Sequence, residues 1–131
     1  AQRTNKARLK ELLTKGGFPF KLRKVLDEGE LGDSLIFFLE SREQTKSFLE
    51  GMKREGLGTK NIPDAMRWHF AKHWNHMFEK YGWYKDSYQT KWQKSADILE
   101  KSIAIPIMIK MTDERINEIA DKILKIASEV K

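Results

Sequence analysis

The sequence predicts a single α+β domain, a small sheet of about three to four strands with helices packed on it. Apolar residues at helical spacing recur in several segments, and short apolar runs of strand length lie between them. The 131 residues are 40% hydrophobic and 34% charged, which is typical of a globular chain with one sizeable core and excludes intrinsic disorder.

The first predicted helix covers Thr4–Lys15, and Gly16-Gly17 ends it. Its apolar stripe is narrow, so we expect this helix to need a second partner beyond the domain. The stripe consists of Leu9, Leu12 and Leu13. Lys21–Leu26 fits either a short strand or a helical turn, and residues 27–33 form an acidic loop that contains glycine.

A continuous apolar run within Ser34–Glu40 predicts a central strand that is covered on both faces. A helix follows directly. Ser41 and Gln44 form a capping box at its start, and Gly56 stands where a left-handed C-cap is expected. Its buried stripe consists of Phe48, Leu49 and Met52.

Helices are also predicted over residues 64–78 and from Asp86 to about Lys101. Ile103–Ile109 reads as a strand, and Pro106 places it at an edge of the sheet or near its own end, because proline has no amide donor. Thr112 caps the last helix. The apolar stripe of this helix consists of Ile116, Ile119, Ala120, Ile123, Ile126, Ala127 and Val130.

The formal charge of +6 is concentrated at the start of the chain. Residues 1–26 hold eight Lys/Arg and one Glu, whereas the remainder holds 17 Lys/Arg and 18 Asp/Glu. Such a segment can bind nucleic acid, but a helix that packs on or leads from another domain is the simpler explanation, and we prefer it. The chain has no cysteine, which excludes disulfides and thiolate metal sites, and no apolar run of membrane-spanning length.

Asn61–Trp92 holds all three histidines, all four tryptophans and all three tyrosines, and we expect the function to lie there. On a helix over residues 64–78, three histidines share one narrow arc: His69, His73 and His76. That arc borders a predicted core stripe of Met66, Phe70, Trp74 and Met77, while Trp68 lies on the far side.

The histidine arc has three interpretations. His69 and His73 are one turn apart, as metal ligands can be, but a His-Glu-x-x-His motif is absent and one straight stripe rarely surrounds a tetrahedral ion. The arc can also be a polar border of the core. Thirdly, it can bind a polyhydroxylated or phosphorylated small molecule, because it sets hydrogen-bonding groups beside aromatic rings.

Residues Leu57–Met77 resemble the carboxy-terminal part of DegT-type sugar aminotransferases, which are pyridoxal-phosphate enzymes of fold type I. The matching positions are Asn61, Pro63, Asp64, Ala65, Trp68, His69, Phe70, Ala71, Trp74, His76 and Met77. The flanks agree in kind, since Ser102–Pro106 and Met111–Glu114 resemble the family's closing strand and final helix. The resemblance covers nearly the whole chain, but it is specific only in Asn61–Met77.

The resemblance implies that residues 1–131 are the carboxy-terminal small domain of a larger cytoplasmic enzyme, with residues 1–16 as the basic helix joining it to a large domain. The full-length homodimer would transfer an amino group from a donor such as glutamate to a keto-sugar, nucleotide-linked or otherwise destined for cell-surface polysaccharide. Pyridoxal phosphate would be bound by the large domain, so no catalytic, cofactor or metal residue is expected here, and the isolated chain should be inactive.

The substrate-binding residues that these arguments predict are Asn61, Trp68, His69, His73 and His76. Neither nucleic acid nor a membrane is an expected partner of that enzyme. A different class of function is a free-standing binding module, either for single-stranded nucleic acid through the basic first helix and exposed aromatics, or for another protein through Trp68, Trp83 and the same helix.

Overall fold

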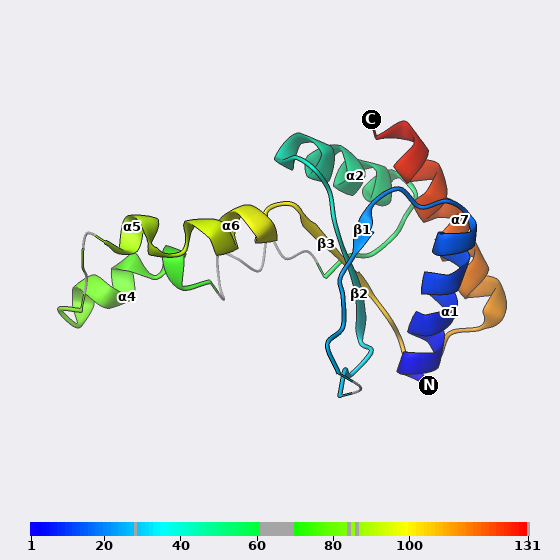
Figure 1. Cartoon of the computed structure of the whole chain (residues 1–131), viewed down its shortest axis with the longest axis horizontal. Helices are drawn as coiled ribbons and strands as arrows, with labels where there is room; N and C mark the ends of the chain where they lie inside the picture. The colour runs from blue at the N-terminus through cyan, green and yellow to red at the C-terminus, as the bar shows by residue number, and fades with distance from the viewer. Residues whose placement is uncertain (28, 61–69, 84, 86, 131) are drawn as a thin grey trace.

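The computed structural model describes residues 1–27, 29–60, 70–83, 85 and 87–130. They form an α+β fold in which helices pack beside a three-stranded antiparallel sheet of order β1-β2-β3 (Figure 1). The elements of this body are α1 (Gln2–Lys15), β1 (Lys21–Leu22), β2 (Ser34–Phe38), α2 (Arg42–Arg54), β3 (Ser102–Pro106) and α7 (Asp113–Glu129).

The strand β2 lies at the centre of the described sheet, as predicted, and β3 at one edge. The register pairs Ser34 with Pro106, so the proline falls at the last position of an edge strand, as its missing amide requires. The ambiguous segment Lys21–Leu26 begins as the short strand β1, and its pairing continues where the Arg23 amide donates to the Ile36 carbonyl at 2.8 Å.

The two faces of β2 are buried to different degrees. Leu35 and Phe37 point into the core, whereas the alternate side chains Ile36 and Phe38 are only half-buried. The prediction of full cover on both faces is therefore wrong for this strand. An antiparallel strand needs only one buried face, and a continuous apolar run does not reveal which face is covered.

The core lies between the sheet and the helices α1, α2 and α7. Four phenylalanine rings form its aromatic centre: Phe18, Phe20, Phe37 and Phe48. Leu9 and Leu13 of α1 are fully buried and α1 packs along α7, as Figure 1 shows. Two of the three leucines in the narrow stripe of the first helix are thus covered within this chain, and a further partner for this helix stays a prediction.

The predicted caps of α2 and α7 are confirmed. The Ser41 hydroxyl accepts a hydrogen bond from the Gln44 amide at 3.1 Å, and the Gln44 side chain accepts from the Glu40 amide at 3.0 Å. Thr112 caps α7 by accepting from the Arg115 amide at 3.2 Å. Gly56 adopts φ +68°, the left-handed conformation that suits glycine after a helix.

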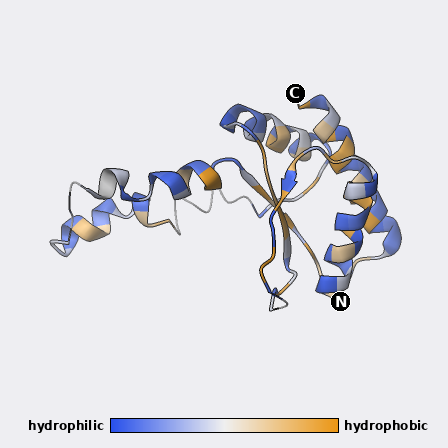
Figure 2. Cartoon of the chain, viewed as in Figure 1, coloured by the Kyte–Doolittle hydropathy of each residue, from blue (hydrophilic) through white to orange (hydrophobic). Residues whose placement is uncertain are grey.

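Residues 70–83, 85 and 87–99 form an arm that projects away from the body (Figure 1). It contains the 3₁₀ turn η1 (Ala71–His73) and the helices α4 (Asn75–Lys80), α5 (Tyr88–Lys91) and α6 (Gln93–Leu99). Polar and apolar residues are interspersed along it, as Figure 2 shows. No helix among the described residues is long and apolar enough to span a membrane.

Both helices predicted for this region differ from the structure. Within 70–78, Phe70 is extended (φ −110°, ψ 120°) and Trp74 leaves the helical range (φ −95°, ψ 21°), so one continuous helix is wrong there. The second predicted helix breaks at Trp92 (φ −112°, ψ 20°), and its expected cap, Asp86, lies outside the described residues. Histidine, asparagine and aromatic residues have weak helix propensity, which explains why short turns replace long helices.

The strand predicted over Ile103–Ile109 is shorter than expected and ends at Pro106. The Ile107 amide still donates to the Asp33 carbonyl at 2.8 Å, but Met108 and Ile109 are exposed. The apolar run therefore continues past the sheet into the link that leads to α7.

Candidate functional site

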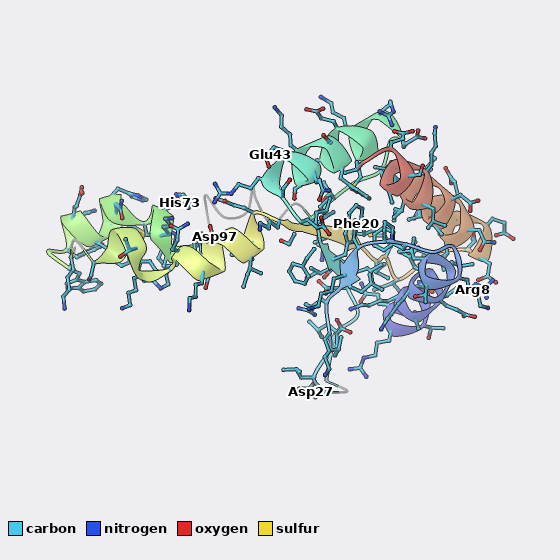
Figure 3. All side chains as sticks on the ribbon, turned by 45° about the horizontal axis from the view of Figure 1, so that its top comes forward. Arg8, Phe20, Asp27, Glu43, His73 and Asp97 are labelled. Atoms are coloured by element: carbon cyan, nitrogen blue, oxygen red, sulfur yellow. The ribbon has the colours of Figure 1, made fainter. Side chains whose placement is uncertain are left out.

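Of the five predicted substrate-binding residues, the structure describes two, His73 and His76. Asn61, Trp68 and His69 lie outside the described residues. His73 ends η1 and His76 lies in the first turn of α4, and both side chains are exposed. Figure 3 shows His73 on the arm together with Asp97, well away from Phe20 in the core.

His73 and His76 do not belong to one helical stripe. The non-helical Trp74 stands between them, so the periodicity that aligned them does not apply. The predicted core stripe fails for the same reason, because Met77 is 44% exposed and Phe70 and Trp74 are only half-buried outside the core cluster. Met66 lies outside the described residues.

The arm is held together by contacts between its outgoing and returning halves. The Phe78 ring of α4 stacks on Trp92 with centroids 6.3 Å apart and an interplanar angle of 19°. The Lys72 ammonium donates to the Gln93 side-chain oxygen at 2.7 Å. The aromatic residues that the sequence concentrates here therefore build the arm itself, in addition to any role toward a ligand.

The base of the arm is tied to the body by ion pairs from α2. The Arg42 guanidinium contacts Asp97 at 3.0 Å and also pairs with Glu100. Gln93 donates to the same Asp97 carboxylate at 2.8 Å, which links this anchor to the Lys72 contact. These polar contacts place the arm relative to α2, although such exposed pairs contribute little stability each.

The outer end of the arm presents aromatic surface. Tyr81 and Trp83 are 56% and 64% exposed, and their rings lie 5.3 Å apart. The Lys80 ammonium lies 5.7 Å from the Tyr81 ring. Exposed rings beside an amine can stack on a flat or sugar-like ligand, and the amine can hydrogen-bond to it. Among the described residues, no group of three metal-ligating side chains is placed to hold an ion.

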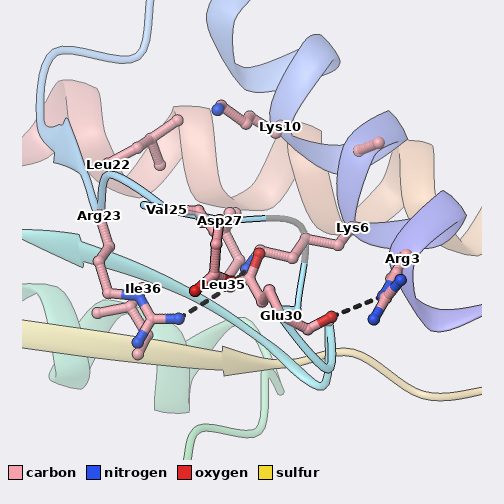
Figure 4. Close-up of a pocket in the computed structure, with 12 residues that line it drawn as sticks. Arg3, Lys6, Lys10, Leu22, Arg23, Val25, Asp27, Glu30, Leu35 and Ile36 are labelled. Carbon is pink, nitrogen blue, oxygen red and sulfur yellow. Dashed lines mark hydrogen bonds and ion pairs between the residues drawn. The ribbon is translucent and has the colours of Figure 1, made fainter.

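The structure also contains a cavity that the sequence did not predict. A cavity of about 250 Å³ lies between α1, β1 and the loop that leads into β2 (Figure 4). Within the described part of the chain, four cationic side chains and two carboxylates line it: Arg3, Lys6, Lys10, Arg23, Asp27 and Glu30. The charge excess of residues 1–26 was the sequence signal for this region, but the sequence did not show that the charges surround a cavity.

Glu30 is the electrostatic centre of this cavity. Its carboxylate pairs with the buried Lys6 ammonium, and it accepts from the Arg23 guanidinium at 2.8 Å. The hydrogen bond from Lys6, with a smaller contribution from Arg23, holds the pKa of Glu30 below its ordinary value although burial opposes this shift. Arg3 donates to the Glu30 carbonyl oxygen at 2.6 Å, so α1 holds both the side chain and the backbone of Glu30.

Gly32 allows this loop to pass close to α1. It adopts φ +79°, and a Cβ at this position would lie 2.9 Å from the Arg3 backbone nitrogen. At the other side of the loop, Asp27 accepts from the Gly29 amide at 2.8 Å and forms a tight turn. The loop is thus shaped by backbone geometry so that Glu30 faces α1.

No protein-family model matches the chain, and no curated protein matches it.

Proposed function

We propose that the chain is the small domain of a pyridoxal-phosphate-dependent aminotransferase that transfers an amino group to a keto-sugar. The observation that carries the proposal is the resemblance of Leu57–Met77 to DegT-type sugar aminotransferases. The α+β body, with its basic first helix packed beside a small antiparallel sheet, is compatible with such a domain. In this proposal the body is the scaffold and the arm contributes the wall that faces substrate.

The arm has the chemistry that this role needs. His73 and His76 are exposed and can exchange hydrogen bonds with sugar hydroxyls. The Phe70 ring lies 6.2 Å from the His73 ring, and the exposed Tyr81 and Trp83 rings on the same arm offer further stacking surface. Because the arm extends beyond the body (Figure 1), it can reach a site whose other half belongs to a separate domain. Asn61, Trp68 and His69 stay in the proposed substrate wall on the strength of the resemblance.

The chain's own residues do not fit the cofactor. Bound pyridoxal phosphate supplies the electron sink for amino transfer, and it needs a lysine that is free to form a Schiff base. Among the described residues the only buried lysine is Lys6, and its ammonium is paired with Glu30. We therefore assign the cofactor to the large domain of the full-length enzyme and expect the 131-residue chain alone to be inactive.

The proposal is tested with the protein produced together with the sequence that precedes Ala1 in its gene. The longer protein should show the absorbance of a lysine-bound pyridoxal phosphate and consume glutamate in the presence of a nucleotide-linked keto-sugar. In that protein His69→Ala should raise the KM for the sugar while leaving the cofactor absorbance unchanged. Absence of both cofactor and transaminase activity in the longer protein would refute the proposal.

The exposed Tyr81–Trp83 pair favours a second candidate, a free-standing protein-interaction module. Light scattering on the isolated chain distinguishes the two functions when it is combined with the activity test. A module that assembles through this surface should lose self-association on Trp83→Ala. For the single-strand nucleic-acid alternative, part of the positive charge of the first segment is already neutralised, because Lys6, Arg8, Lys15 and Arg23 form ion pairs with carboxylates.

A further inference from the structure

The cavity between α1 and the β1–β2 loop has the features of a small anion-binding site. Cations face it from two walls: α1 supplies Arg3, Lys6 and Lys10, and the end of β1 supplies Arg23 (Figure 4). Its volume of about 250 Å³ lies just below the range of about 300–1,000 Å³ that is typical of sites for drug-sized ligands. It can therefore hold a charged group with only a few further atoms.

The Glu30 carboxylate already shows that an anion is stable in this position. It lies between the Lys6 ammonium and the Arg23 guanidinium, which come from opposite walls. The two cations thus meet at one point, as they must in order to contact a single anionic ligand. Glu30 lies in a loop, whereas Lys6 lies on the helix α1. An anionic ligand can therefore replace the Glu30 carboxylate between the two cations.

The positive charge of the cavity exceeds what its carboxylates neutralise. Among the described residues Lys10 has no ion-pair partner, and the hydrogen bond found for Arg3 goes to the uncharged Glu30 carbonyl. Counting only the residues that the structure describes, four cations therefore face two carboxylates, and Asp27 already accepts from the Gly29 amide. A phosphate dianion, with three acceptor oxygens, neutralises this excess of positive charge better than a ligand with a single carboxylate does.

We propose that this cavity binds the phosphate group of a small phosphomonoester, which takes the place of the Glu30 carboxylate between Lys6 and Arg23 and extends toward Arg3 and Lys10. This site is separate from the arm and independent of the aminotransferase proposal. Glu30 acts as an internal competitor that holds the loop against α1 until the ligand displaces it.

The test is an NMR titration of the 131-residue chain with inorganic phosphate and with glycerol phosphate, at constant ionic strength. Each of the two ligands should cause saturable changes in the chemical shifts of the amides in α1 and in residues 22–36. Lys10→Gln should weaken binding about fivefold, the upper range for an exposed ion pair. Glu30→Gln should strengthen binding about tenfold, because it removes the competing charge and frees two cations.

Lys46→Gln is the matched control, because Lys46 is an exposed lysine on α2 outside the cavity and its loss should leave the affinity unchanged. Lys10 is exposed, so its variant should keep the wild-type amide spectrum and stays informative even if Glu30→Gln loosens the loop. The proposal fails if wild-type shifts do not saturate, if Lys46→Gln weakens binding as much as Lys10→Gln, or if folded Glu30→Gln binds phosphate less tightly.

Discussion

Replacing Phe48 with alanine should remove a large part of the stability of the body. The Phe48 side chain is fully buried on α2, and its ring lies 5.1 Å from Phe37 and 5.9 Å from Phe20 in edge-to-face contacts. Truncation of a buried phenylalanine costs about 3–5 kcal/mol, because transfer free energy is lost and a cavity remains. The total free energy of unfolding of a domain is about 5–15 kcal/mol. This single change therefore removes roughly a third to a half of a mid-range value of about 10 kcal/mol.

Urea denaturation followed by circular dichroism measures this loss. With an m-value of about 2 kcal/mol/M, a loss of about 4 kcal/mol lowers the midpoint by about 2 M urea. Ile98→Ala is the matched control, since Ile98 is 56% exposed on α6 and its truncation should stay within about 0.5 kcal/mol. A loss below about 1 kcal/mol for Phe48→Ala would show that the contacts of Phe48 with the other phenylalanines contribute little to the stability of the core.

Three further outcomes are expected. Ser41→Ala should lower the free energy of unfolding by about 1 kcal/mol in the same urea assay, because it removes the N-cap of α2. Trp92→Ala should speed hydrogen exchange of the Trp83 amide, which donates to the Phe78 carbonyl at 2.7 Å, about fivefold or more, while β2–β3 amides keep their protection. The lowered pKa of Glu30 predicts a stabilising contribution that is complete above the ordinary glutamate pKa and is lost as pH falls through the lowered value. Unfolding curves at a series of acidic pH values should show this loss in the wild type and a smaller one in Glu30→Gln.

Much of the body was predictable because its signals are local. The hydroxyls of Ser41 and Thr112 cap α2 and α7 as expected, and Gly56 takes the left-handed conformation after its helix. Pro106 falls at the end of an edge strand, for the reason that its chemistry gives. Each of these features depends on a few neighbouring residues and on backbone hydrogen bonding, which the sequence specifies directly.

The candidate site was less predictable, because the prediction applied helical periodicity across residues that are not helical. Phe70 and Trp74 interrupt the helix on which His73 and His76 were aligned, so their shared face does not exist. The density of aromatic residues did mark an unusual segment correctly. That density does not reveal that ring contacts such as Phe78–Trp92 hold an arm together outside the core.

The sequence by itself determined the α+β class, the caps of α2 and α7, the central strand and the basic character of the opening segment, and it restricted Pro106 to a sheet edge or a strand end. Only the tertiary structure decided where these pieces meet. The convergence of Lys6 and Arg23 on Glu30 depends on how α1 packs beside β2, and on the left-handed Gly32 that lets the loop approach α1. Helix caps and strand ends depend on a few neighbouring residues. A cavity is formed by residues distant in sequence, and their positions follow from the packing of the whole domain.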